Sequence, residues 1–203
     1  MKLRSITAAA LLCLSTQVFA AYTLHIYESG GDVVASGSGS INTAGLPAPT
    51  ISNTRPLARG TDALVYIGGT TNIAGTAMDL FNSGVAGPTS FGTSTTLTYA
   101  DAGLGDFVGI LGDTGRMFVP LGYTSQSLLS SSAVWSATTL AALGLTPGTY
   151  TWTWGAGPTA DSFTVQIGPL AAAAIPTLSE WALIGLSSIL AMLGISRMRR
   201  RQG

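Results

Sequence analysis

Few residues of this chain have the chemistry needed for covalent catalysis or for binding a transition metal. Cys13 is the only cysteine and His25 the only histidine among 203 residues. One cysteine cannot make an intramolecular disulfide framework, and one of each residue excludes a metal site built from several cysteine and histidine ligands. Nucleophilic catalysis with a histidine base also has little material to draw on. We therefore expect a protein that is not an enzyme and that uses no cofactor and no metal.

Carboxylates offer a second kind of chemistry. Asp101, Asp106 and Asp113 lie in glycine-rich stretches, and carboxylates beside glycines can bind calcium. The D-x-D-x-D-G spacing of a calcium loop is absent, so we interpret these residues as turn formers. A polysaccharide-acting hydrolase needs two carboxyl groups that face one cleft, and nothing in the spacing selects such a pair.

Aromatic side chains offer a third kind, because rings can stack on sugars. Tyr150, Trp152 and Trp154 alternate with threonines, which places the three rings on one face of a predicted strand. They are therefore candidate glycan contacts. A row of rings is more often the core face of a strand, and we favour that interpretation. The apolar residues of the next predicted strand, 161–167, would pack on the same side if residues 155–160 close the two strands into a hairpin.

The C-terminal segment carries the most specific pattern in the chain. A heptapeptide precedes an uncharged apolar stretch and a basic tail, and its residues are Ile175, Pro176, Thr177, Leu178, Ser179, Glu180 and Trp181. Pro176 biases the residue before it away from the helix, and Thr177 or Ser179 can cap a helix that follows. Glu180 would lie in the first turn of that helix, where the positive end of the helix dipole favours a negative charge. A membrane protease can engage such a junction between extended peptide and helix.

This segment resembles the IPTL-CTERM protein-sorting domain, a variant of the PEP-CTERM signals of Gram-negative bacteria. The resemblance covers residues 175–201, with Ala182 where the family often has a glycine. It implies that an exosortase-type membrane transpeptidase recognises the tail, cuts near the motif and releases or transfers the protein. The family is also associated with export of exopolysaccharide, which makes exopolysaccharide a further candidate partner.

The apolar stretch predicts a single transmembrane helix over about residues 181–196. Its uncharged core, residues 181–195, reaches roughly 22 Å at about 1.5 Å per residue, against a hydrocarbon layer of about 30 Å. Long basic side chains that extend to the interface make up part of the difference. The membrane-orienting tail should stay cytoplasmic by the positive-inside rule, and it consists of Arg197, Arg199, Arg200 and Arg201.

The N-terminal residues 1–20 predict a signal peptide. Lys2 and Arg4 precede a short apolar stretch at residues 6–14, which is too short to span a bilayer. Val18 and Ala20 then supply the small or aliphatic side chains that signal peptidase needs for cleavage before Ala21. The expected partners are the Sec translocon and signal peptidase, and the mature chain would contain no cysteine.

The formal net charge of zero conceals three unlike regions. The two ends are basic, whereas residues 21–174 hold three arginines against eight acidic residues, a formal net charge of −5. Nucleic-acid-binding proteins concentrate lysine and arginine on the folded surface, so nucleic acid is excluded as a partner. We divide the chain into a signal peptide (1–20), an extracytoplasmic domain (21–174) and a sorting signal (175–203).

The extracytoplasmic domain must hold these residues on β-strands. Short alternating or apolar runs separated by glycine and proline predict strands at residues 22–27, 63–67, 95–99, 107–111, 117–119, 149–154 and 161–167. Residues 140–143 predict one helical turn, and His25 lies on the polar face of the first strand. The expected fold class is all-β, a sandwich or jelly-roll-like domain.

The leading hypothesis is an exported protein with a structural or adhesive role at the cell surface or in the extracellular matrix of a biofilm. It would pass through an intermediate anchored in the inner membrane of a Gram-negative bacterium. A carbohydrate-binding module that uses the aromatic row is the second hypothesis, and a hydrolase acting on polysaccharide is the third.

Overall fold

The computed structural model describes residues 21–169, which belong to the first of two units of the chain, Met1–Pro169. Their regular structure consists of β-strands and of three short 3-10 helices, η1 (Thr43–Gly45), η2 (Gly112–Thr114) and η3 (Gly157–Thr159). The predicted all-β class is therefore confirmed. The predicted signal helix and transmembrane helix lie outside the described residues. Within residues 21–169, no helix has the length and apolar character needed to cross a membrane.

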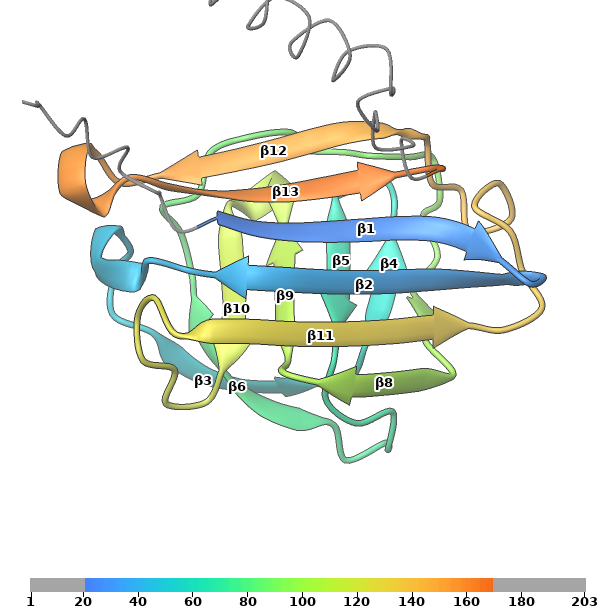
Figure 1. The fold of residues 1–203 in the computed structure, drawn as a ribbon, viewed down its shortest axis with the longest axis horizontal. Helices are drawn as coiled ribbons and strands as arrows, with labels where there is room; N and C mark the ends of the chain where they lie inside the picture. The colour runs from blue at the N-terminus through green and yellow to red at the C-terminus, as the bar shows by residue number, and fades with distance from the viewer. Residues whose placement is uncertain (1–20, 170–203) are drawn as a thin grey trace, which may run out of the picture. The chain divides into compact units, whose positions relative to one another are not determined.

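The strands of the described region form two sheets (Figure 1). The first, called sheet A, runs in the order β12 (Gly148–Trp154), β13 (Asp161–Ile167), β1 (Ala21–Ser29), β2 (Asp32–Ser40), β11 (Leu128–Trp135) and β8 (Ala102–Gly105). The second, called sheet B, runs in the order β3 (Thr50–Thr54), β6 (Thr76–Phe81), β10 (Arg116–Pro120), β9 (Val108–Leu111), β5 (Leu64–Ile67), β4 (Leu57–Arg59) and β7 (Thr98–Tyr99). Neighbouring strands are antiparallel except β1 and β13, which pair in parallel and join the first described strand to the last.

The two sheets pack face to face as a sandwich, and Figure 1 shows the central strands of sheet B (β10, β9, β5 and β4) crossing steeply behind those of sheet A. Such crossing is the orthogonal form of sheet packing. The main hydrophobic core lies between the sheets and takes side chains from both, among them Leu24 of β1 and Val65 of β5. Aromatic contacts consolidate it, since the Phe163 ring stacks on Tyr22 at 5.2 Å and meets Trp152 edge-on at 6.4 Å between centroids.

A second apolar cluster lies on the other face of sheet B. In β5, Val65 belongs to the main core whereas Leu64 and Tyr66 belong to this second cluster, because successive side chains of a strand point to opposite faces. We call it the outer cluster, and its members are Leu57, Leu64, Tyr66, Met78, Phe107 and Phe118. The Tyr66 ring lies 4.5 Å from that of Phe118. Sheet B is thus apolar on both faces.

The predicted strands at 22–27, 63–67, 107–111, 117–119, 149–154 and 161–167 correspond to β1, β5, β9, β10, β12 and β13, and the hairpin closed by residues 155–160 is confirmed. The strand predicted at 95–99 is wrong over most of its length, because β7 contains only Thr98–Tyr99. Residues 140–143 lie in hydrogen-bonded turns, in which the N–H of Leu143 donates to the carbonyl of Thr139.

The sequence did not predict β2, β3, β4, β6, β8 or β11. In β2, the pattern DVVASGSGS is poor in residues that favour strands. Gly37 is needed there because a Cβ at that position would collide with the Tyr22 hydroxyl on the neighbouring strand. The close approach of the buried Tyr22 ring therefore explains why β2 contains Gly37, although glycine in a sequence usually indicates a turn.

A loop distant in sequence pairs with the edge of β12 that faces away from β13. Thr153 exchanges two backbone hydrogen bonds with Ala86, its N–H donating at 2.8 Å and its carbonyl accepting at 2.9 Å. Gly92 makes an isolated bridge to Leu145 further along the same edge. Covering an edge strand removes unpaired backbone groups that would otherwise pair with another chain.

Candidate functional site

The aromatic row predicted on β12 lies mostly in the core. Trp152 is 0% exposed and Trp154 is 4% exposed, while Tyr150 is half-buried beside the core. The indole N–H of Trp152 donates to the Pro88 carbonyl at 2.8 Å, and that of Trp154 donates to the Asn42 carbonyl at 2.8 Å. The favoured core interpretation therefore holds. The glycan-contact alternative is corrected for both tryptophans, because neither ring has a face open to a sugar.

The Tyr150 side chain also makes contacts that stabilise the fold. Its hydroxyl donates to the Thr146 carbonyl at 3.0 Å, and its ring meets Phe91 edge-on at 5.8 Å. The threonines that alternate with the aromatic row, Thr149, Thr151 and Thr153, are exposed on the opposite face of β12. The accessible side of this strand is thus a row of hydroxyls.

The acidic residues of the glycine-rich stretches hold turns and strand ends together. Asp101 accepts the Ser136 N–H at 2.7 Å, and Asp106 accepts the Ser130 N–H at 2.9 Å. Both carboxylates satisfy backbone donors of the segment around β11, 24 and 35 residues away, so these bonds link distant segments and are not those of a local turn. Asp113 is exposed in the 3-10 helix η2. Over residues 21–169, no three histidine, cysteine, aspartate or glutamate side chains converge as a metal site would require.

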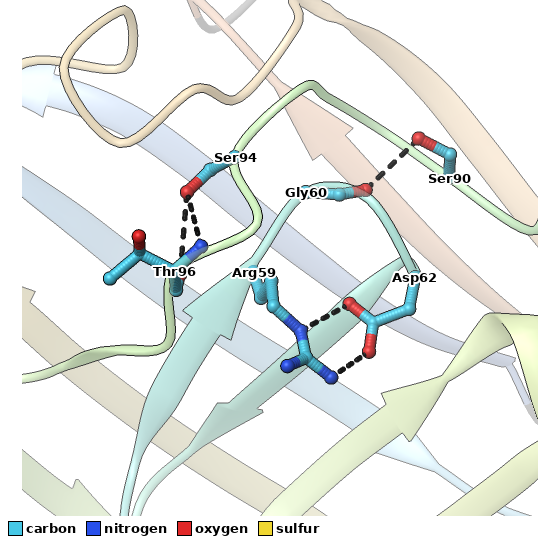
Figure 2. A network of polar contacts seen from close by, with 6 residues as sticks. All are labelled: Arg59, Gly60, Asp62, Ser90, Ser94 and Thr96. Atoms are coloured by element: carbon cyan, nitrogen blue, oxygen red, sulfur yellow. Dashed lines mark hydrogen bonds and ion pairs between the residues drawn. The ribbon is translucent and has the colours of Figure 1, made fainter.

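An ion pair that the sequence analysis did not single out closes the turn between β4 and β5 (Figure 2). The Arg59 Nε–H donates to Asp62 Oδ1 at 2.8 Å, and its Nη2 donates to Oδ2 of the same carboxylate. The hydrogen bond to the Asp62 carboxylate raises the pKa of the Arg59 guanidinium. The i,i+3 spacing of opposite charges around a glycine was the signal in the sequence.

Hydroxyls next to this ion pair hold the covering loop in place. The Ser90 hydroxyl donates to the Gly60 carbonyl at 3.0 Å, and the Ser94 hydroxyl donates to the Thr96 carbonyl at 3.3 Å (Figure 2). Every hydrogen bond drawn here runs between a side chain and backbone or between the two charged partners. The network therefore anchors the loop to the turn between β4 and β5.

Asp161 is a buried acid at the start of β13. It accepts the Asn42 N–H at 2.6 Å and the N–H of Ser162 at 2.7 Å, and only 5% of the residue is exposed. Burial raises the pKa of this carboxyl, and the two backbone donors oppose that rise in part. Its neighbours are the backbone donors of a strand junction, so its geometry is that of a structural acid.

A cavity of about 470 Å³ opens at one end of sheet A, and it is lined by Glu28, Leu140, Ala141, Leu145, Pro147 and Pro169. The Glu28 carboxylate is the charged group of this lining, and it accepts the Leu140 N–H at 2.7 Å. His25 is half-buried on β1 and points to the opposite side of the strand from Leu24 and Ile26, as predicted. His25 is not among the residues that line this cavity.

The candidate processing residues fall largely outside the described part of the chain. Val18 and Ala20 precede it, and the whole heptapeptide at 175–181 and the arginines of the basic tail follow it. Ala21 is the first residue of β1. The described region thus lies between the predicted signal peptide and the predicted sorting signal.

Comparison with known proteins identifies the C-terminal signal. The family model described as the IPTL-CTERM motif matches residues 173–200. The chain therefore carries an IPTL-CTERM motif, as its resemblance to PEP-CTERM-like sorting-domain proteins implied, and the match coincides closely with the segment predicted from sequence. No curated protein and no solved structure matches the chain. The motif indicates an exported protein with a C-terminal sorting signal.

Proposed function

We propose that this chain is a non-enzymatic structural or adhesive protein of the bacterial cell surface or extracellular matrix. The observation that carries the proposal is the IPTL-CTERM match at residues 173–200. In this proposal an exosortase-type transpeptidase processes the tail after the Sec translocon has exported the chain. The membrane-anchored form is an intermediate on the route to the surface of a Gram-negative cell.

The proposed cleavage after Ala20 is compatible with the fold of the described region. Because β1 begins at Ala21, cleavage there leaves the first strand whole and able to pair with β2 and β13. The parallel pairing of β1 with β13 joins the two ends of the sandwich, so removal of residues before 21 and after 174 would spare every described strand.

A passive role is supported by how the described acidic residues are used. Asp101, Asp106 and Asp161 accept backbone N–H groups, and Asp62 is paired with Arg59. These carboxylates are therefore engaged in holding the fold. The two tryptophans of the aromatic row are buried and offer no ring face to a sugar.

Alanine replacement of Ile175, Pro176, Thr177 and Leu178 tests the sorting proposal. In the native host, we expect the wild-type protein to lose mass at both ends and to reach the cell surface, whereas the variant retains its tail in the membrane fraction. Intact-mass measurement and cell fractionation report the two outcomes. A matched control replaces Ala171 and Ala172 by serine and should be processed normally. Identical processing of the wild type and the motif variant would overturn the proposal.

A further inference from the structure

Within residues 21–169, no segment covers the outer face of sheet A, the side away from the core. Figure 1 views the molecule from this side, and no described segment is drawn across the long strands of the sheet. Strand pairing brings five residues into register as a hydroxyl row, which consists of Thr151, Thr164, Thr23, Ser38 and Ser130. All five are exposed or half-buried. The row therefore crosses five neighbouring strands with a hydroxyl on each.

A second polar row and an apolar row lie beside the first. Two residues further along the strands, the second row consists of Thr149, Gln166, His25, Ser36 and Ser132. Two residues beyond that, the apolar row consists of Tyr27, Val34, Val134 and Ala102, all exposed or half-buried. The outer face thus presents two polar rows next to an accessible apolar strip that ends in a tyrosine ring.

The geometry of these rows is regular and fixed by the backbone. Neighbouring strands lie about 4.8 Å apart, so hydroxyls recur across the sheet at a spacing comparable to the size of one sugar ring. The Thr151 and Thr164 hydroxyls already contact each other at 3.1 Å. Serine and threonine have few rotatable bonds, so ordering them on a ligand costs little conformational entropy.

The two polar rows themselves contain no carboxylate, lysine or arginine, although the domain carries a formal net charge of −5 over residues 21–174. His25 is the single ionisable side chain in the two polar rows. Among the acids around these rows, Asp161 lies in the core, Glu28 and Asp32 lie at the end of the β1–β2 hairpin, and Asp106 lies at the end of the hydroxyl row, where it accepts the Ser130 N–H. The rows hold no lysine or arginine that could bind an acidic polymer, and the carboxylates lie at their margins.

We propose that the outer face of sheet A binds a neutral polysaccharide. Sugar hydroxyls would exchange hydrogen bonds with the two polar rows, and the apolar C–H surface of the sugar rings would pack on the strip at Tyr27, Val34 and Val134. An uncharged ligand matches two polar rows that contain no carboxylate, lysine or arginine, on an otherwise acidic domain. The inference rests on the proposed function only in that an exported protein meets such polymers, and it names the partner that an adhesive role requires.

Co-sedimentation with particulate polysaccharides tests this inference directly. The full-length chain is purified in a polyoxyethylene detergent, which has no sugar, and is mixed with amorphous cellulose, a β-1,3-glucan or a mannan, and separately with alginate gel as the acidic polymer. We expect binding to at least one neutral polymer and none to alginate. Because the purified protein is used, failure of sorting in cells and failure of binding are observed separately.

Paired variants show whether the face is responsible. Ser38→Lys with Thr151→Lys places two long cations in the hydroxyl row and should weaken binding at least about tenfold, equivalent to two lost hydrogen bonds. Ser38→Thr with Thr151→Ser keeps both hydroxyls and should bind as the wild type. Thr61→Lys with Thr114→Lys adds the same charge at exposed turns of sheet B and should also bind normally.

Circular dichroism and the denaturation midpoint must show that each variant is folded. Tyr27→Ala provides a second test, through the apolar strip, and should weaken binding by about threefold to tenfold. The inference is overturned if no neutral polymer sediments the wild-type chain. It is also overturned if the folded lysine variant binds as well as the wild type, if alginate is preferred, or if sedimentation velocity shows that the face instead pairs two copies of the chain.

Discussion

The two outer faces of the sandwich are built from different residues. The outer face of sheet A carries serine and threonine on β12, β13, β1, β2 and β11, whereas the outer face of sheet B buries the outer cluster around Tyr66 and Phe118. The same difference separates two apolar residues, since Leu128 on sheet A is 88% exposed and Phe118 on sheet B is 4% exposed. Sheet B therefore buries apolar side chains on both faces. Over residues 21–169, sheet A leaves its outer face exposed to solvent.

The largest expected effect comes from the outer cluster of sheet B. Phe118→Ala should lower the free energy of unfolding by about 3–5 kcal/mol, because it opens a void beside Tyr66. The matched change on sheet A, Leu128→Ala, should stay within about 0.5 kcal/mol, since the side chain is already in solvent. Urea denaturation monitored by tryptophan fluorescence measures both. Equal losses for the two variants would contradict the difference between the faces.

A smaller effect is expected at the ion pair of sheet B. Asp62→Asn removes the charge that faces the Arg59 guanidinium and should cost about 1 kcal/mol, since both groups are partly exposed to solvent. The measurement is the same denaturation series, repeated at high salt, where the cost should shrink through screening. Thr61→Ala, an uncharged change at an exposed residue of the same turn, serves as the control, and a comparable loss there would show that the turn, and not the pair, is being measured.

The third prediction concerns the buried acid of sheet A. Burial raises the pKa of Asp161, so the folded protein binds a proton at this carboxyl more tightly than the unfolded chain does. The stabilisation from Asp161 is therefore fully present below the unfolded pKa and is lost as the pH rises through the folded pKa. Unfolding free energies of the wild type and Asp161→Asn, measured between about pH 3 and about pH 7, should show the wild-type advantage falling over this window. A difference independent of pH would contradict it.

The smallest effect is expected in the hydroxyl row. Thr164→Ala removes one hydroxyl contact, that with Thr151, and should change the free energy of unfolding by no more than about 0.5 kcal/mol. Thermal denaturation followed by circular dichroism measures the change. A loss above about 2 kcal/mol would mean that this face is covered in the folded protein and is unavailable to a ligand.

How well the sequence predicted each strand depended on what covers the strand. On β12, two buried tryptophans alternate with exposed threonines, and this alternation identified the strand and its core face. The continuous run on β5 also identified a strand, and its burial on both faces explains why it does not alternate. The strand β2 was missed because serine and glycine do not favour strands. Ser36 and Ser38 face solvent, and Gly37 lacks a side chain where the Tyr22 hydroxyl lies close to the backbone.

The candidate site was predictable only in its linear parts. The IPTL-CTERM segment was recognised from sequence because its order, spacing and terminal position lie within one continuous stretch. The hydroxyl row was not, because Thr23, Ser38 and Thr151 become neighbours only through strand pairing across distant parts of the chain. Likewise, no feature of the sequence around Pro88 predicts that its carbonyl accepts the Trp152 indole N–H, 64 residues away.

The sequence by itself determined the all-β class, the charge contrast between the ends and the body, and the sorting signal, because each depends on composition or on residues close together in the chain. Only the tertiary structure decided that the aromatic row belongs to the core and that the outer faces of the two sheets differ. The physical reason is that exposure depends on what packs against a strand. Alternation separates the two faces of β12, but the partner sheet and the covering loop decide which of them is buried.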